Sequence, residues 1–76
     1  MEEFKDRLAA QRRRRLLTQK ELAAQLDVAW QTVGAWERGT MEPRMAHVRK
    51  LCAALDVTPE ELLGEDWWKP AHQDVA

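Results

Sequence analysis

The chain has 76 residues, enough for one small domain, and its composition of 45% hydrophobic and 33% charged residues is typical of a globular protein. It contains no serine, three dispersed glycines and one cysteine, which exclude a serine nucleophile, a glycine-rich phosphate loop, an internal disulfide and a cysteine-based zinc site. The net charge of −1 conceals an asymmetry, since residues 1–20 carry seven basic and three acidic side chains and residues 58–76 carry one basic and five acidic.

The first half of the chain predicts helices, because apolar residues recur at helical spacings and no run alternates with the period of a β-strand. We expect a first helix over about residues 3–14. A second, over about 19–26, begins after Thr18, and Glu21 stands three residues later, as in a capping box. Only residues 27–29 separate this helix from the next.

The third predicted helix covers about residues 30–37 and stops before Gly39, a residue suited to a left-handed C-terminal cap. Pro43 keeps the residue before it out of a helix, so we expect a loop before a fourth helix over about 44–55. Two helices joined by a turn as short as 27–29 cross steeply, and the second projects from the domain. This geometry favours insertion into a groove.

A fifth helix is predicted after Thr58, with Pro59 at its first position and Glu61 completing a second capping box. The expected architecture is therefore an all-α domain of five helices over residues 1–64, followed by a C-terminal tail over 65–76. The apolar positions predict a core made of Phe4, Leu8, Leu22, Ala23, Leu26, Val33, Trp36, Met45, Val48, Leu51, Cys52 and Leu55.

The tail carries two adjacent tryptophans, Trp67 and Trp68, among mostly polar residues. Two neighbouring side chains cannot both face one side of an extended segment. Either both fold back to cover the small core, or one contacts a second copy of the chain, since tryptophan is enriched at interface hot spots. The sequence leaves both interpretations open.

Several segments together resemble the helix-turn-helix of the Cro and phage-repressor family, also called the XRE family. The matching segments are LTQKELA at 17–23, LDV at 26–28, TV at 32–33, WERG at 36–39, Pro43, LCAALDV at 51–57 and PEELL at 59–63. Each piece alone is a weak signal, but the combination is correctly spaced over about residues 4–63 and is specific. The resemblance implies a compact five-helix domain of the lambda-repressor-like type, whose third helix enters the DNA major groove.

Carried over position by position, the resemblance also implies which residues contact DNA. Gln19, at the start of the second helix, would contact phosphate with its backbone amide assisted by the helix N-terminus. The positions that face bases are Trp30, Gln31, Thr32 and Ala35. The positions that flank the end of the third helix and would touch phosphate or the groove edge are Arg38, Thr40 and Arg44. Arg12 and Glu37 stand where the family often has an ion pair between the first and third helices.

Among these positions, Gln31 is the best candidate for sequence recognition, because a glutamine amide can form two hydrogen bonds with adenine. A solvated helix position would also accommodate it. Trp30 offers one donor and a large apolar edge, which suit a thymine methyl group, a sugar or a protein partner. Arg13, Arg14 and Arg15 either solvate the first helix or attract phosphate.

The chain departs from the family at several positions. Leu16, Asp27 and Asp56 stand where glycine is common. Aspartate tolerates a left-handed backbone better than leucine does, so we expect the turn between the first two helices to differ locally. Ala29 replaces the usual Ser or Thr cap of the third helix, which forfeits roughly 0.5–2 kcal/mol. Gly34 inside that helix costs up to ~1 kcal/mol relative to alanine, so the helix must depend on the packing beneath it.

The resemblance therefore implies a transcriptional regulator, acting as a repressor, that binds double-stranded DNA as a homodimer through the helix at 30–37. The alternative is an antitoxin or accessory regulator whose main partner is a protein such as a toxin. We expect no enzyme, cofactor or metal, because neither a nucleophile–base arrangement nor a cluster of metal ligands is present. The charged start has no secretory apolar segment, and no stretch has the ~18 apolar residues of a membrane span, so we expect a cytoplasmic protein with no membrane partner.

Overall fold

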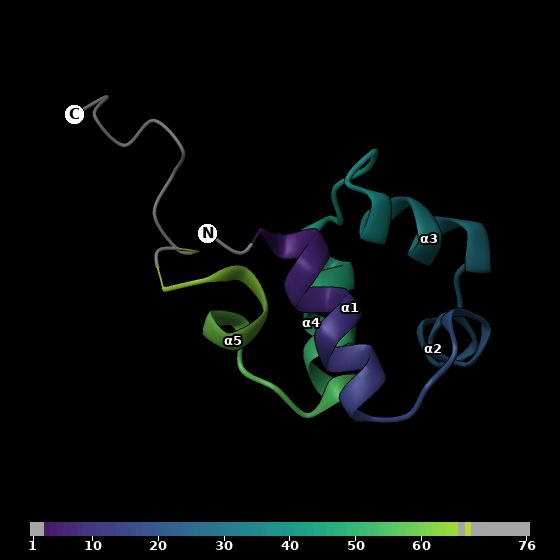
Figure 1. Cartoon of the computed structure of the whole chain (residues 1–76), viewed down its shortest axis with the longest axis horizontal. Coiled ribbons are helices and arrows are strands. Elements are labelled where there is room, and N and C mark those ends of the chain that lie inside the picture. The colour runs from purple at the N-terminus through teal and green to yellow at the C-terminus, as the bar shows by residue number, and fades with distance from the viewer. Residues whose placement is uncertain (1–2, 66, 68–76) are drawn as a thin grey trace.

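The computed structural model describes residues 3–65 and 67, which form five helices (Figure 1). The helices are α1 (Phe4–Arg14), α2 (Gln19–Leu26), α3 (Trp30–Arg38), α4 (Met45–Leu55) and α5 (Pro59–Leu63), and no strand occurs within the described residues. The predicted all-α class and the order of the helices are confirmed. The observed boundaries lie within one residue of the expected ones.

The starts of α2 and α5 are capping boxes, as predicted. The Glu21 amide donates to the Thr18 hydroxyl at 3.0 Å, and the Thr18 amide donates to the Glu21 carboxylate at 2.7 Å. Thr58 and Glu61 repeat this arrangement at 3.2 and 2.8 Å. The start of α3 differs, because Ala29 supplies no side-chain cap.

The core gathers one apolar face from each helix. Its buried members are Leu8, Leu22, Ala23, Leu26, Val33, Trp36, Val48, Leu51, Leu55 and Leu62. The prediction that Met45 belongs to this core is wrong, since its side chain is 47% exposed. Met45 lies at the first position of α4. Its side chain borders an open hollow of about 270 Å³, which Phe4, Pro43 and Leu63 also line. The other predicted members are buried or, like Phe4 and Cys52, half-buried against the core.

The turns between the helices contain three non-glycine residues in the left-handed region, Leu16, Asp27 and Asp56, with φ of 59°, 58° and 56°. The local difference expected at the turn between α1 and α2 is not found, because Leu16 adopts the left-handed conformation in spite of its side chain. The guanidinium of Arg12 donates to the carbonyl of Leu17 at 2.8 Å, and Leu17 packs against the core. These contacts impose the turn, so Leu16 accepts a strain of about 1–2 kcal/mol with its side chain 88% exposed.

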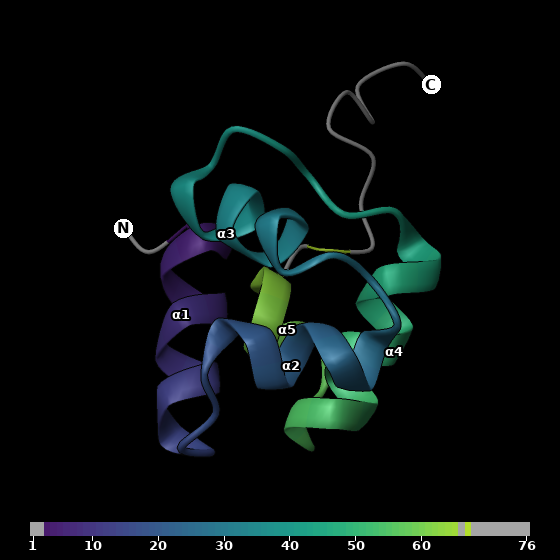
Figure 2. The ribbon, with the colours of Figure 1, turned by 90° about the vertical axis from the view of Figure 1, so that its right-hand side faces the viewer.

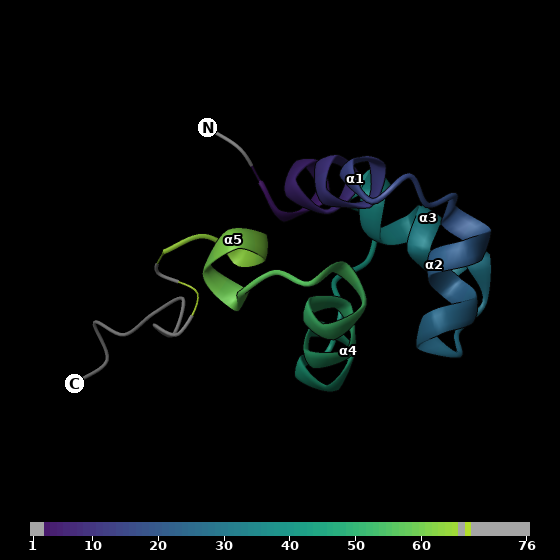
Figure 3. The same cartoon turned by 90° about the horizontal axis from the view of Figure 1, so that it is seen from below.

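The helices α2 and α3 lie together on one side of the molecule, and α5 lies on the opposite side (Figures 1 and 3). Viewed from the side of α2, as in Figure 2, α2 runs in front, below α3, with α1 and α4 to the left and right. Trp36 of α3 is 1% exposed and contacts the ring of His47 on α4, with 5.3 Å between ring centroids. This packing fixes one face of α3 against the domain, while Trp30 in its first turn is exposed to solvent.

Candidate nucleic-acid interface

The first turn of α3 presents two of the predicted contact residues to solvent. Trp30 is 45% exposed, and Gln31 is exposed beside it. Thr32 is half-buried. Because Ala29 does not cap the helix, the backbone N–H groups of Trp30 and Gln31 keep their hydrogen-bonding capacity, whereas that of Thr32 donates to the Ala29 carbonyl at 2.9 Å. An α-helix start of this kind can approach a groove without removing an internal cap.

Ala35 is not presented with these residues. It is only 8% exposed, and its carbonyl accepts hydrogen bonds from the Thr40 amide at 3.1 Å and the Thr40 hydroxyl at 3.3 Å. Ala35 stands four residues after Gln31 and therefore on the same side of α3, and it does not belong to the cluster of core residues. Little of the Ala35 side chain is therefore available for contact, and its role in facing a base stays a prediction.

The start of α2 contributes Lys20, which sequence reasoning did not single out. Its Nζ lies 5.5 Å from the centroid of the Trp30 ring, within the range of a cation–π interaction. The contact joins the first turn of α2 to the first turn of α3, and it places a positive charge next to the exposed indole. The position of Lys20 directly after Gln19 is the only sequence signal that could have indicated it.

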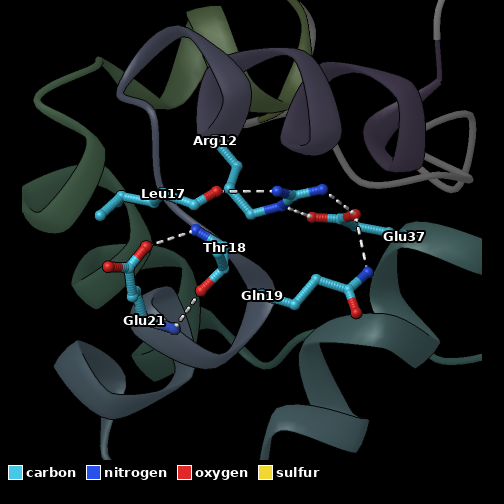
Figure 4. A network of polar contacts seen from close by, with 6 residues as sticks. All are labelled: Arg12, Leu17, Thr18, Gln19, Glu21 and Glu37. Atoms are coloured by element: carbon cyan, nitrogen blue, oxygen red, sulfur yellow. Dashed lines mark hydrogen bonds and ion pairs between the residues drawn. The ribbon is translucent and has the colours of Figure 1, made fainter.

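A network of polar contacts connects α1, α2 and α3 behind this surface (Figure 4). Arg12 donates to both oxygens of the Glu37 carboxylate, through Nε at 2.6 Å and Nη2 at 3.0 Å, as the expected ion pair requires. The side chains of the pair are only 12% and 7% exposed. The side-chain amide of Gln19 also donates to Glu37, at 3.1 Å. The network therefore connects the end of α3 to α1, through Arg12, and to the start of α2, through Gln19.

The contacts in this network favour the charged forms of both Glu37 and Arg12. Burial by itself would raise the pKa of the Glu37 carboxyl, but hydrogen bonds from Arg12 and Gln19 and the positive charges of Arg12 and Arg13 outweigh it. The pKa of Glu37 consequently lies below its ordinary value, and the hydrogen bond to Glu37 raises the pKa of Arg12. The Glu37 carboxylate is thus ionised, and its negative charge is balanced by the positive charge of Arg12.

The network also changes what Gln19 can offer a ligand. Its side-chain amide is already engaged with Glu37, whereas its backbone N–H is the first of α2 and has no partner within the helix. A phosphate contact at Gln19 would therefore use the backbone, as the sequence analysis expected.

The remaining predicted residues surround the end of α3 and the following loop. Arg38, Thr40 and Arg44 are exposed. Arg44 precedes α4 and borders a hollow of about 340 Å³ together with Thr32 and Glu42. The structure thus brings Arg44 and Thr32 to the same hollow, although one precedes α4 and the other lies in α3.

The arginine run of α1 is divided between two surroundings. Arg12 belongs to the partly buried ion pair, while Arg14 and Arg15 border a hollow with Asp56 and Glu61. The nearest approach there is 4.0 Å, between Arg15 and Asp56. Because the two carboxylates offset part of the basic charge, this part of the run offers less attraction to phosphate than its sequence indicates.

Within residues 3–65 and 67, no group of three or more His, Cys, Asp and Glu side chains is arranged to hold a metal ion. In the same part of the chain, every helix is too short or too polar to cross a membrane.

The comparisons with known proteins agree with this geometry. The sequence pattern of the family described as Helix-turn-helix matches residues 8–62. A similar solved structure is the restriction-modification controller protein C.AhdI from Aeromonas hydrophila, with 35% identity over 79% of this chain and 91% of that chain and a TM-score of 0.75. Another is the P22 c2 repressor in complex with a synthetic operator, with 27% identity over 86% of this chain and 100% of that chain and a TM-score of 0.80. No curated protein sequence matches the chain.

Both similar structures are of regulatory proteins and not of enzymes, as expected for the sequence. Their folds are of the lambda-repressor-like type that the resemblance implied. With the family pattern covering most of the chain, the protein belongs to the helix-turn-helix family of the Cro and phage-repressor type.

Proposed function

We propose that the protein regulates transcription by binding double-stranded DNA, with the first turn of α3 in the major groove. The observation that carries the proposal is the exposed, uncapped start of α3, where Trp30 and Gln31 project beside Lys20. The opposite side of the same helix is fixed by Trp36 and Glu37. A rigidly held helix with a free polar and aromatic first turn suits contact with base edges.

Two kinds of contact make up the proposed interface. Gln31 would bond to a base, since its amide matches the donor and acceptor pair of adenine, and Trp30 would contact a thymine methyl group or a sugar. Phosphates would be bound by the backbone at Gln19, by Lys20 and by Arg38, and these contacts carry little sequence information. Thr32, Thr40 and Arg44 extend the same surface around α3.

The relatives support repression as the regulatory outcome, since the P22 protein is a repressor that binds an operator. The controller protein supports the wider role of transcription control. The alternative, an antitoxin or accessory regulator with a toxin as its main partner, has no support among these relatives.

A homodimer is part of the proposal, because helix-turn-helix proteins commonly bind paired half-sites. Trp67 is half-buried, and its indole N–H donates to Glu60 of α5 at 3.1 Å. The helix α5 lies on the side of the molecule away from α3 (Figure 1). Trp68 lies outside the described residues. Truncation after Gly64 should leave a folded domain but shift it toward monomer and weaken DNA binding. Sedimentation of both chains at equal concentration tests this, and an unchanged dimer or a monomer in both cases would contradict it.

The experiment that tests the function is selection of duplexes from a random-sequence pool by the purified full chain. We expect enrichment of a two-fold symmetric motif, and binding whose log–log salt dependence has a slope of about −0.9 per phosphate contact. A pool that stays random after selection, or an affinity for duplex DNA that does not change with salt, would contradict the proposal.

A further inference from the structure

We propose that Gly34 is a positioning residue, whose missing side chain allows Arg38 to fold back along α3 and reach the junction with α2. The inference rests on the proposed DNA-binding function of the α2–α3 surface. It assigns a purpose to a glycine that otherwise only weakens the helix.

The space at Gly34 is occupied by the side chains of two other residues. A Cβ atom placed on Gly34 would lie 3.0 Å from Nη1 and 3.9 Å from Cζ of Arg38, and 3.6 Å from Oε1 of Gln19. The first of these distances is tighter than an ordinary van der Waals contact. Gly34 is buried although it has no side chain, and these two neighbours lie over it.

The backbone does not require glycine at this position. Gly39 and Gly64 have positive φ, whereas Gly34 is not among the residues of the left-handed region and lies inside α3. Alanine would be the better helix former there. The structural reason for glycine is therefore room for Arg38 and Gln19 and not a special backbone conformation.

The direction of Arg38 follows from helix geometry. Side chains in a helix point toward its N-terminus, so Arg38 extends over the residue four positions earlier, which is Gly34. Its guanidinium thereby comes next to Gln19, the first residue of α2, instead of extending past the end of α3. A planar guanidinium at this junction has the donor geometry that binds a phosphate in two places.

The local charge is suited to that contact. The nearest carboxylate of the network, Glu37, is paired with Arg12 at 2.6 Å and also accepts from Gln19. Arg38 is exposed, and Lys20 contributes a second positive charge at the start of α2. A Cβ at position 34 would push the flexible end of Arg38 away from this junction without moving the helix backbone, because only side-chain atoms lie in its path.

The test compares the full chain with Gly34→Ala, Arg38→Ala and the double variant, each titrated with a short duplex of mixed sequence at several salt concentrations. We expect Gly34→Ala to raise the Tm by a few degrees, through helix propensity. The same variant should bind DNA about two- to tenfold more weakly, with a salt slope smaller by up to about 0.9. In the Arg38→Ala background, adding Gly34→Ala should change neither the affinity nor the slope.

Three results would overturn the inference. One is a Gly34→Ala variant with the affinity and salt slope of the unmodified chain. Another is an equal loss of affinity in the presence and absence of Arg38, which would mean that the new methyl group itself obstructs DNA. A third is a lowered Tm of Gly34→Ala, which would show that the added methyl group displaces the helix and not the Arg38 side chain. If the unmodified chain does not bind the duplex at all, the proposed function fails as well, and this distinguishes the two failures.

Discussion

The helices α2 and α3 begin in opposite ways. At α2, Thr18 and Glu21 form a complete capping box, so the first turn is stabilised by residues within the helix and its immediate neighbour. At α3, Ala29 provides no cap, and no acidic side chain stands in the first turn. The comparison indicates that α2 is fixed by its local sequence, whereas α3 is fixed by contacts with distant parts of the chain.

Those distant contacts lie in the second half of α3. Trp36 is buried in the core, and Glu37 is bound by Arg12 of α1 and Gln19 of α2. The first turn is thus left without a side-chain cap, and Lys20 contacts it through the ring of Trp30, whereas the second half of the helix is bound to α1, α2 and α4. A recognition surface needs this combination, since groups that bind a ligand must not already be satisfied inside the protein.

The largest effect is expected from Glu37→Gln, which removes the charge that attaches α3 to α1. Loss of one partner from a nearly buried pair should lower the free energy of unfolding by about 3 kcal/mol at neutral pH. Because the pKa of Glu37 is lowered in the folded protein, its contribution is complete above the ordinary carboxyl range and is lost as pH falls through the lowered pKa.

Denaturant unfolding at several pH values checks this prediction. The gap between the unmodified chain and Glu37→Gln should close in acid, and Glu42→Gln, at an exposed loop carboxylate, should stay within about 0.5 kcal/mol throughout. A gap that persists unchanged at low pH would contradict the assignment of the ion pair as the link.

Next in size is Thr18→Ala, which removes the local cap of α2. We expect the free energy of unfolding to fall by about 1 kcal/mol. Thr58→Ala is the matched control, because the capping box of α5 has nearly the same hydrogen-bond distances and should be worth about the same. If Thr18→Ala has no measurable effect in thermal unfolding, α2 is not fixed by its own cap.

A smaller, opposite effect is expected from Ala29→Ser, which adds the missing cap to α3. Ala29 already has the extended conformation of a cap residue, so the gain should be about 0.5–1 kcal/mol. Ala29→Asp should stabilise the free protein similarly but weaken DNA binding, because it adds a negative charge beside the proposed groove contact. Equal DNA affinity of the two variants would argue that the start of α3 does not approach DNA.

The smallest effect is expected at the turn that leads into α2. Leu16→Gly relieves the left-handed strain but increases the freedom of the unfolded chain, so a net gain of about 0.5 kcal/mol is expected. Asp56→Gly should gain less, because aspartate tolerates this backbone better. A clear loss of stability in Leu16→Gly would mean that the exposed leucine makes a contact that stabilises the domain.

The helices, the capping boxes of α2 and α5 and most of the core could be predicted, because periodicity and caps are local properties of the sequence. The ion pair of Arg12 and Glu37 followed from the family resemblance. The engagement of Gln19 by Glu37 could not be predicted, because it depends on how closely α3 crosses α2. The left-handed turn at Leu16 is likewise imposed by its surroundings, against the preference of the residue.

The central claim is that the exposed first turn of α3 recognises sequence while the α2–α3 junction binds phosphate. It is tested most directly by measuring affinities for a selected duplex and all its single-base variants with Gln31→Ala and Arg38→Ala. Gln31→Ala should lose about 1–3 kcal/mol of discrimination at one position per half-site, and Arg38→Ala should weaken every duplex alike. A uniform loss in both variants, with discrimination unchanged, would contradict the account.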